Sequence, residues 1–231
     1  MSDIGNQIAA LIDTTGPGYA WVPGDFAQLG SRDVIDKTLQ RMVARGQLRR
    51  IDRGLYDKPA ISSLTKRATT PDYQAVIDAI ARRDNLRLLV DGMTAANDLG
   101  LTTAVPAKVT IYTDTRRRSI SLDNLRIDFK LSAPSRLYWA GRPAMRVVQA
   151  LHWLKDTMGT DAEHISQKID TLLHAGKKGA PIRDDLRQGF NVLPIWMQDF
   201  MRGMLDLTPD KPDDTLQPKQ KSGRQHKEHA Q

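Results

Sequence analysis

Hydrophobic residues recur at helical spacing in two stretches near the N-terminus, residues 3–13 and residues 32–45. A shorter helix is predicted between them, over residues 23–30. Ser31 is suited to cap the last of these helices, and Gly46 is suited to end it. The chain is therefore predicted to begin with three helices joined by short connections.

Two short extended runs, residues 48–52 and 54–58, follow the third helix and meet at Arg53-Gly54. A helix, a short helix, a longer helix and a hairpin, in this order, are typical of a winged helix-turn-helix. Residues 1–60 are therefore predicted to form a winged helix-turn-helix DNA-binding domain, with residues 32–45 as its recognition helix.

The pattern changes after residue 60. Residues 61–71 are rich in serine and threonine and are predicted to be a linker. Residues 72–207 are predicted to form a mixed α/β domain with C-terminal helices. Three of its strands, at 109–112, 119–122 and 125–131, are interpreted as a small β-meander. Residues 208–231 have almost no apolar side chain and are predicted to be a disordered polar tail. The expected fold class is α/β (α+β).

The charge of the chain indicates which kind of partner it binds. The chain of 231 residues carries 34 lysines and arginines against 27 aspartates and glutamates, a formal net charge of +7. A basic chain favours polyanionic partners, nucleic acid first. Residues 41–53 hold arginines at five positions against the single Asp52. Positive charge is therefore expected where a winged helix meets the DNA backbone.

The candidate DNA contacts are the polar and cationic residues that this fold would leave on the surface. Arginine and glutamine can read guanine and adenine edges, lysine acts as a point charge, and a helix N-terminus can bind phosphate. The set is Ser31, Arg32, Lys37, Gln40, Arg41, Arg45, Arg49, Arg50 and Arg53. The alternative is a winged helix that binds protein, since one fold serves several functions.

A second set of basic residues falls in the α/β domain. Three consecutive arginines, residues 116–118, are predicted to lie at the tip of the first hairpin of the meander and to form a local anion site. The whole set is Arg116, Arg117, Arg118, Lys130, Arg136, Arg142 and Arg146. It is interpreted as an extension of the DNA contact, as an RNA or partner contact, or as a solvated hairpin tip.

Motifs for other chemistry are missing from the sequence. There is no cysteine, and the histidines do not have the spacing of a helical metal pair. Gly30-Ser31 resembles the start of a nucleotidyltransferase motif, but Asp33 and Asp36 follow too closely to supply its magnesium ligands. We therefore expect no catalytic residue, metal or cofactor, and a binding protein rather than an enzyme.

The N-terminus has no signal-peptide pattern, and no apolar run reaches the length of a membrane span. We therefore expect a soluble, cytoplasmic protein without a membrane partner.

The segment FAQLGSRDVIDKTLQRMVARGQLRRIDRGLYDKP, residues 26–59, resembles the N-terminal winged helix of AbiEi-family antitoxins. The residues that carry this likeness are Leu39, Gln40, Arg41, Met42, Gly46, Leu48, Arg50, Ile51, Arg53, Gly54 and Tyr56. Residues 91–107 and 141–151 are similar to the segments that follow in a DUF6088-like branch. The resemblance covers about residues 5–160.

The resemblance implies an antitoxin of a type IV toxin–antitoxin system. Its N-terminal winged helix would bind double-stranded DNA, at repeats in the operon's own promoter, and repress transcription. Its C-terminal domain would neutralise an AbiEii-like nucleotidyltransferase toxin without needing a stable complex. An alternative is a C-terminal domain that acts directly on a toxin or on its substrate, as an RNA-binding module or an enzyme.

Overall fold

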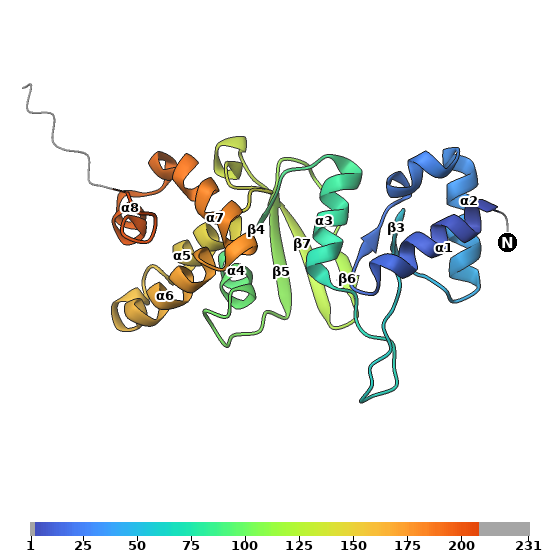
Figure 1. The fold of residues 1–231 in the computed structure, drawn as a ribbon, viewed down its shortest axis with the longest axis horizontal. Helices are drawn as coiled ribbons and strands as arrows, with labels where there is room; N and C mark the ends of the chain where they lie inside the picture. Colours follow the sequence, from blue (N-terminus) through green and yellow to red (C-terminus); the bar gives the residue numbers. More distant parts are fainter. Residues whose placement is uncertain (1–2, 208–231) are drawn as a thin grey trace, which may run out of the picture. The chain divides into compact units, whose positions relative to one another are not determined.

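The structure, a computed structural model, describes residues 3–207, so the predicted polar tail at 208–231 lies outside the described residues. The protein has a mixed α/β fold (Figure 1). Within residues 3–207, no helix combines the length and the apolar character needed to cross a membrane. The described chain divides into two compact units, one ending at Gln188 and the other beginning at Gly189.

The first unit begins with the helices and hairpin that the sequence predicts. Its N-terminal elements are α1 (Asp3–Thr15), β1 (Ala20–Trp21), η1 (Pro23–Leu29), α2 (Arg32–Ala44), β2 (Arg49–Asp52) and β3 (Leu55–Asp57). The strands form an antiparallel sheet in the order β1-β3-β2. This arrangement is compatible with a winged helix. We call residues 3–57 the N-terminal module.

One hydrophobic core holds the N-terminal module together. It includes Ile8 and Ile12 of α1, Phe26 of η1, and Ile35 and Leu39 of α2, all essentially without solvent exposure. Burial of such side chains is the main favourable term in folding. Because the apolar stripe of α2 faces this core, the opposite face of the helix is left for solvent and ligands.

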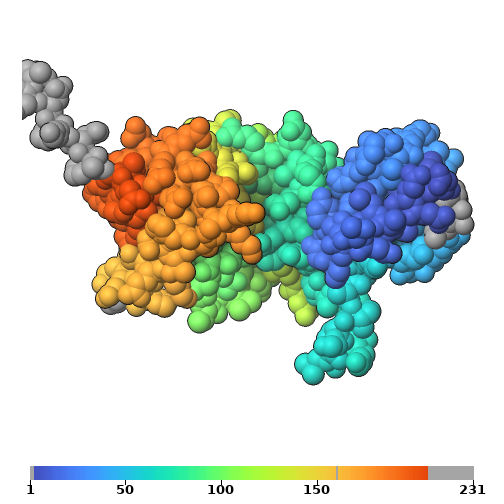
Figure 2. All heavy atoms as spheres, in the orientation of Figure 1, coloured from blue at the N-terminus to red at the C-terminus, as the bar shows by residue number. Residues whose placement is uncertain are grey.

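Residues 58–72 connect the N-terminal module to the next helix and project from the surface (Figure 2). They fold back on themselves through an antiparallel bridge between Ile61 and Ala68, and Leu64 near the turn is 90% exposed. The segments on both sides of this connection belong to the first compact unit. The division into separate domains at 61–71 stays a prediction.

The rest of the first unit is a four-stranded sheet with helices. Its elements are α3 (Tyr73–Asp84), β4 (Leu88–Val90), α4 (Gly92–Asp98), β5 (Lys108–Thr113), β6 (Ile120–Leu122), β7 (Leu125–Leu131), η2 (Pro134–Leu137), α5 (Met145–Leu154), α6 (Met158–Leu173) and α7 (Gly176–Gln188). The second unit contains η3 (Phe190–Val192) and α8 (Ile195–Met201).

The predicted β-meander is wrong. The strand order is β4-β5-β7-β6, and β5 pairs with β7 in parallel. The turn at Asp123-Asn124 is so short that β6 and β7 must pair. Residues 114–119 can extend over about 20 Å and need only about 10 Å to pass one intervening strand. Arg116, Arg117 and Arg118 therefore lie in a connection that passes β7, not at a hairpin tip.

The conspicuous sequence at residues 91–94 has a structural role. The Asp91 carboxylate caps α4 by accepting from the Thr94 backbone N–H at 3.1 Å, and it also accepts from the Thr110 N–H on β5 at 2.8 Å. Gly92 lies close to α5, where an added Cβ would be 2.6 Å from Trp153 Cβ. Asp91 and Gly92 thus fix α4 between the sheet and α5.

Candidate nucleic-acid interface

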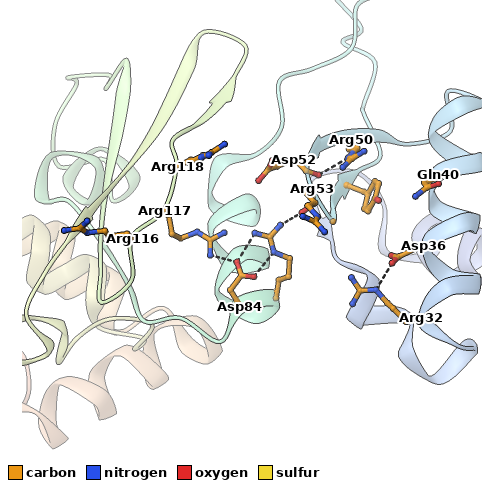
Figure 3. A pocket seen from close by; sticks show the side chains of 13 residues that line it. Arg32, Asp36, Gln40, Arg50, Asp52, Arg53, Asp84, Arg116, Arg117 and Arg118 are labelled. Atoms are coloured by element: carbon orange, nitrogen blue, oxygen red, sulfur yellow. Dashed lines mark hydrogen bonds and ion pairs between the residues drawn. The ribbon is translucent and has the colours of Figure 1, made fainter.

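A groove of about 810 Å³ lies where α2, the β2–β3 hairpin, the end of α3 and the β5–β6 connection meet (Figure 3). Its lining residues are Arg32, Asp36, Gln40, Arg50, Asp52, Arg53, Gly54, Tyr56, Arg83, Asp84, Arg116, Arg117 and Arg118. Seven of these are arginine and three are aspartate, so the lining has a positive balance. We call this site the arginine groove.

One wall of the arginine groove is an edge of α2. Arg32, Asp36 and Gln40 are spaced by four residues, which places them along one side of the helix. Arg32 Nε lies 2.9 Å from Asp36 Oδ2, and both side chains are exposed to solvent. Surface pairs of this kind contribute little to stability, so Arg32 can exchange this partner for a ligand at small cost.

The β2–β3 hairpin supplies the next part of the lining. Arg50 donates to the Asp52 carbonyl at 3.4 Å, a long contact for an exposed side chain. Arg53 stands at the turn, where Gly54 has the positive φ of +64° that favours glycine. Tyr56 on β3 is almost fully buried, and burial raises the pKa of its hydroxyl. The hairpin thus contributes two arginines and a tyrosine to the lining of the groove.

The end of α3 joins the hairpin to the β5–β6 connection. The Asp84 carboxylate accepts from Arg83 Nε at 3.0 Å and Nη2 at 2.8 Å, and it lies 2.5 Å from Arg117 Nη1. The hydrogen bond from Arg83 lowers the Asp84 pKa most, and the charges of Arg83 and then Arg117 lower it further, so that it lies below its usual value. Arg83 Nη1 also donates to the Arg53 carbonyl.

Several predicted DNA contacts lie outside the arginine groove. Lys37 and Arg41 are exposed on other sides of α2, and Arg45 is exposed directly after its end. Arg41 bends back to donate to Thr38 Oγ1 at 3.1 Å. Ser31 is exposed, and its side chain makes no capping hydrogen bond. These residues remain available on the surface of the N-terminal module.

Arg49 differs from the other arginines of the hairpin. It makes two hydrogen bonds to the Asp57 carboxylate, at 3.0 and 2.6 Å, and a third to the Thr69 carbonyl at 2.8 Å. The bond to Asp57 raises the pKa of Arg49. Arg49 therefore holds the hairpin to the projecting connection, and we leave it out of the proposed interface.

The second predicted basic set is divided by the structure. Arg116, Arg117 and Arg118 line the arginine groove, whereas Lys130 and Arg136 are exposed outside it. The remaining two arginines are held by buried carboxylates. Arg142 pairs with Asp185 at 2.6 Å, and Arg146 pairs with Asp98 at 2.9 Å. The first pair joins the turn before α5 to α7, the second joins α5 to α4, and both serve packing.

Sequence reasoning did not predict six of the lining residues: Asp36, Asp52, Gly54, Tyr56, Arg83 and Asp84. One signal was available for the last of these. Asp84 is the final residue of α3, where the helix dipole disfavours a carboxylate. Such a residue requires nearby cations, and the structure supplies them.

Comparison with known protein families assigns the chain to one of them. Residues 7–180 match a family described as "Family of unknown function (DUF6088)", and because the match spans most of the chain, the protein belongs to it. The matched range includes every residue that lines the arginine groove. Comparison with curated proteins finds no match.

Proposed function

We propose that the protein binds double-stranded DNA, with α2 as the recognition helix and the arginine groove as a contact for the sugar–phosphate backbone. The observation that carries the proposal is that arginines from four separate elements line one groove. Duplex DNA carries one negative charge per about 1.7 Å of its axis, so closely spaced cations bind it by releasing counterions.

Four of the groove arginines have no carboxylate partner among the described residues. They are Arg50, Arg53, Arg116 and Arg118. Because their guanidinium groups are not neutralised, each can contact a phosphate without first breaking an ion pair. Their number sets the expected salt dependence of binding.

The exposed face of α2 supports DNA rather than RNA as the ligand. Gln40 and Lys37 project from an α-helix whose other face is buried in the core of the N-terminal module. The major groove of B-DNA admits an α-helix, whereas the deep and narrow major groove of A-form RNA does not. Gln40 is suited to read adenine there.

The resemblance of residues 26–59 to AbiEi-family antitoxins supplies a biological setting. We propose that the DNA bound is the protein's own promoter, that binding represses transcription in the cytoplasm, and that the α/β part neutralises an AbiEii-like nucleotidyltransferase toxin. An adjoining nucleotidyltransferase-like gene is expected. If no such gene exists, the protein would be a repressor without the toxin partner.

The experiment is a gel shift with the full chain and three ligands: its own upstream DNA, a scrambled duplex of the same length, and double-stranded RNA of the upstream sequence. We expect preference for the upstream DNA. Arg50→Ala should weaken binding to both DNAs, while the control Arg136→Ala, an exposed arginine outside the groove, should not. Absence of binding to DNA, or stronger binding to RNA, would contradict the proposal.

A further inference from the structure

We propose that the β5–β6 connection is a second phosphate-contact element of the interface, and that Asp84 is the residue that positions it. The inference rests on the proposed DNA binding and states how the part of the arginine groove outside the N-terminal module is held in place for it. In this proposal Arg116 and Arg118 contact the stretch of DNA backbone next to the stretch that α2 and the hairpin contact.

The geometry of the connection fits this role. Arg117, the middle arginine of the three, turns inward: it pairs with Asp84 and lies over the Phe129 ring at 5.6 Å. Arg116 and Arg118 are exposed and have no carboxylate partner among the described residues, yet they line the same groove as α2. Arg117 thus fixes the connection, and its two neighbours are left for a ligand.

Three consecutive residues at the end of α3 hold the parts of the groove together. Arg82 donates to the Ala20 carbonyl at 3.0 Å and lies over the Tyr19 ring at 4.9 Å. Arg83 donates to the carbonyl of Arg53 in the hairpin turn, and Asp84 binds the β5–β6 connection. The end of α3 therefore sets the spacing between the N-terminal module and the connection.

The unfavourable location of the Asp84 carboxylate supports a positioning role. A carboxylate at a helix C-terminus opposes the helix dipole, and a carboxylate in a phosphate-binding groove repels the ligand. Both effects are unfavourable. Asp84 offsets them by binding Arg83 and Arg117, which orients these two side chains.

Asp84→Asn separates two explanations. If Asp84 acts only through its charge, removing that charge makes the groove more positive and binding to DNA tighter. If Asp84 positions the connection, its loss releases Arg117 and with it the placement of Arg116 and Arg118, and binding becomes weaker.

The experiment measures the affinity of the full chain for its upstream DNA across a salt series. Arg118→Ala should lower the magnitude of the log–log slope by about 0.9, the value for one phosphate contact. Its deficit relative to wild type should therefore shrink about 3–4-fold between 50 and 200 mM salt. Asp84→Asn should bind several-fold more weakly than wild type. The reference is Asp33→Asn, which removes an exposed carboxylate of α2 outside the groove and should bind slightly more tightly.

The outcomes can be distinguished. An unchanged slope in Arg118→Ala, or tighter binding by Asp84→Asn, would overturn the inference even though Arg50→Ala weakens binding. Absence of DNA binding by the wild type would instead refute the proposed function. Arg118 is exposed, so its variant tests the connection even if Asp84→Asn lowers thermal stability.

Discussion

Arg49 and Arg50 are neighbours on β2, but substitution by alanine should have different consequences at the two positions. Arg49→Ala should lower stability, and Arg50→Ala should lower DNA affinity. Side chains alternate between the two faces of a strand. Arg49 makes its two hydrogen bonds to Asp57, which is 9% exposed, while Arg50 lines the arginine groove. Arg49→Ala leaves the Asp57 carboxylate buried without its partner. Arg50→Ala removes only an exposed side chain with one long hydrogen bond.

The size of the first effect follows from burial. Breaking a buried pair costs about 3–5 kcal/mol, and because Arg49 is itself 27% exposed we expect about 2–4 kcal/mol of unfolding free energy. For a unit of this size that corresponds to a fall in Tm of roughly 5–15 °C. Arg50→Ala should change the free energy of unfolding by less than about 0.5 kcal/mol.

Thermal unfolding and DNA affinity of both variants provide the assay. Arg50→Ala should keep the wild-type Tm and lose affinity, with a salt slope smaller by about 0.9. Arg49→Ala should lose stability and, below its Tm, keep the wild-type slope. The reasoning would be refuted if Arg49→Ala lowered the slope at unchanged Tm, or if Arg50→Ala unfolded at the lower temperature.

Three further predictions concern the stability of the fold. Asp91→Ala should lower the free energy of unfolding by about 1–3 kcal/mol in urea titrations, because it removes the cap of α4 and the bond to Thr110. Gly92→Ala should cost about 1–3 kcal/mol by the same measurement, since the added methyl group collides with Trp153. The Asp84 pKa is lower in the folded chain than in the unfolded chain, so its ionised form stabilises the fold at neutral pH. This stabilisation should fade as pH falls below about 4, and Asp84→Asn should make the acid decline in Tm shallower.

The N-terminal module could be predicted well from the sequence because its signals are local. The helical spacing of residues 32–45 and the turn glycines at 46 and 54 are signals contained in a few adjacent residues. The structure confirms α2, its end and the hairpin. Exposure of Arg32 and Gln40 also follows from helical geometry alone.

The arginine groove could not be predicted because its parts come from distant segments. Strand pairing between 108–113 and 125–131 is decided by packing over long separations, and short strands of similar composition leave the order open. The partners of the basic residues are equally remote. Arg142 and Arg146 pair with carboxylates 43 and 48 positions away, so the sequence did not distinguish them from the unpaired arginines in the groove.

The salt dependence of binding tests the central claim most directly. The four groove arginines without a carboxylate partner predict that log affinity for the upstream DNA falls with log salt at a slope steeper than about −3.6. The double variant Arg50→Ala, Arg118→Ala should lose about half of that slope, while Arg136→Ala should keep it. A wild-type slope near zero, or a double variant with the wild-type slope, would contradict the assignment of this groove to DNA.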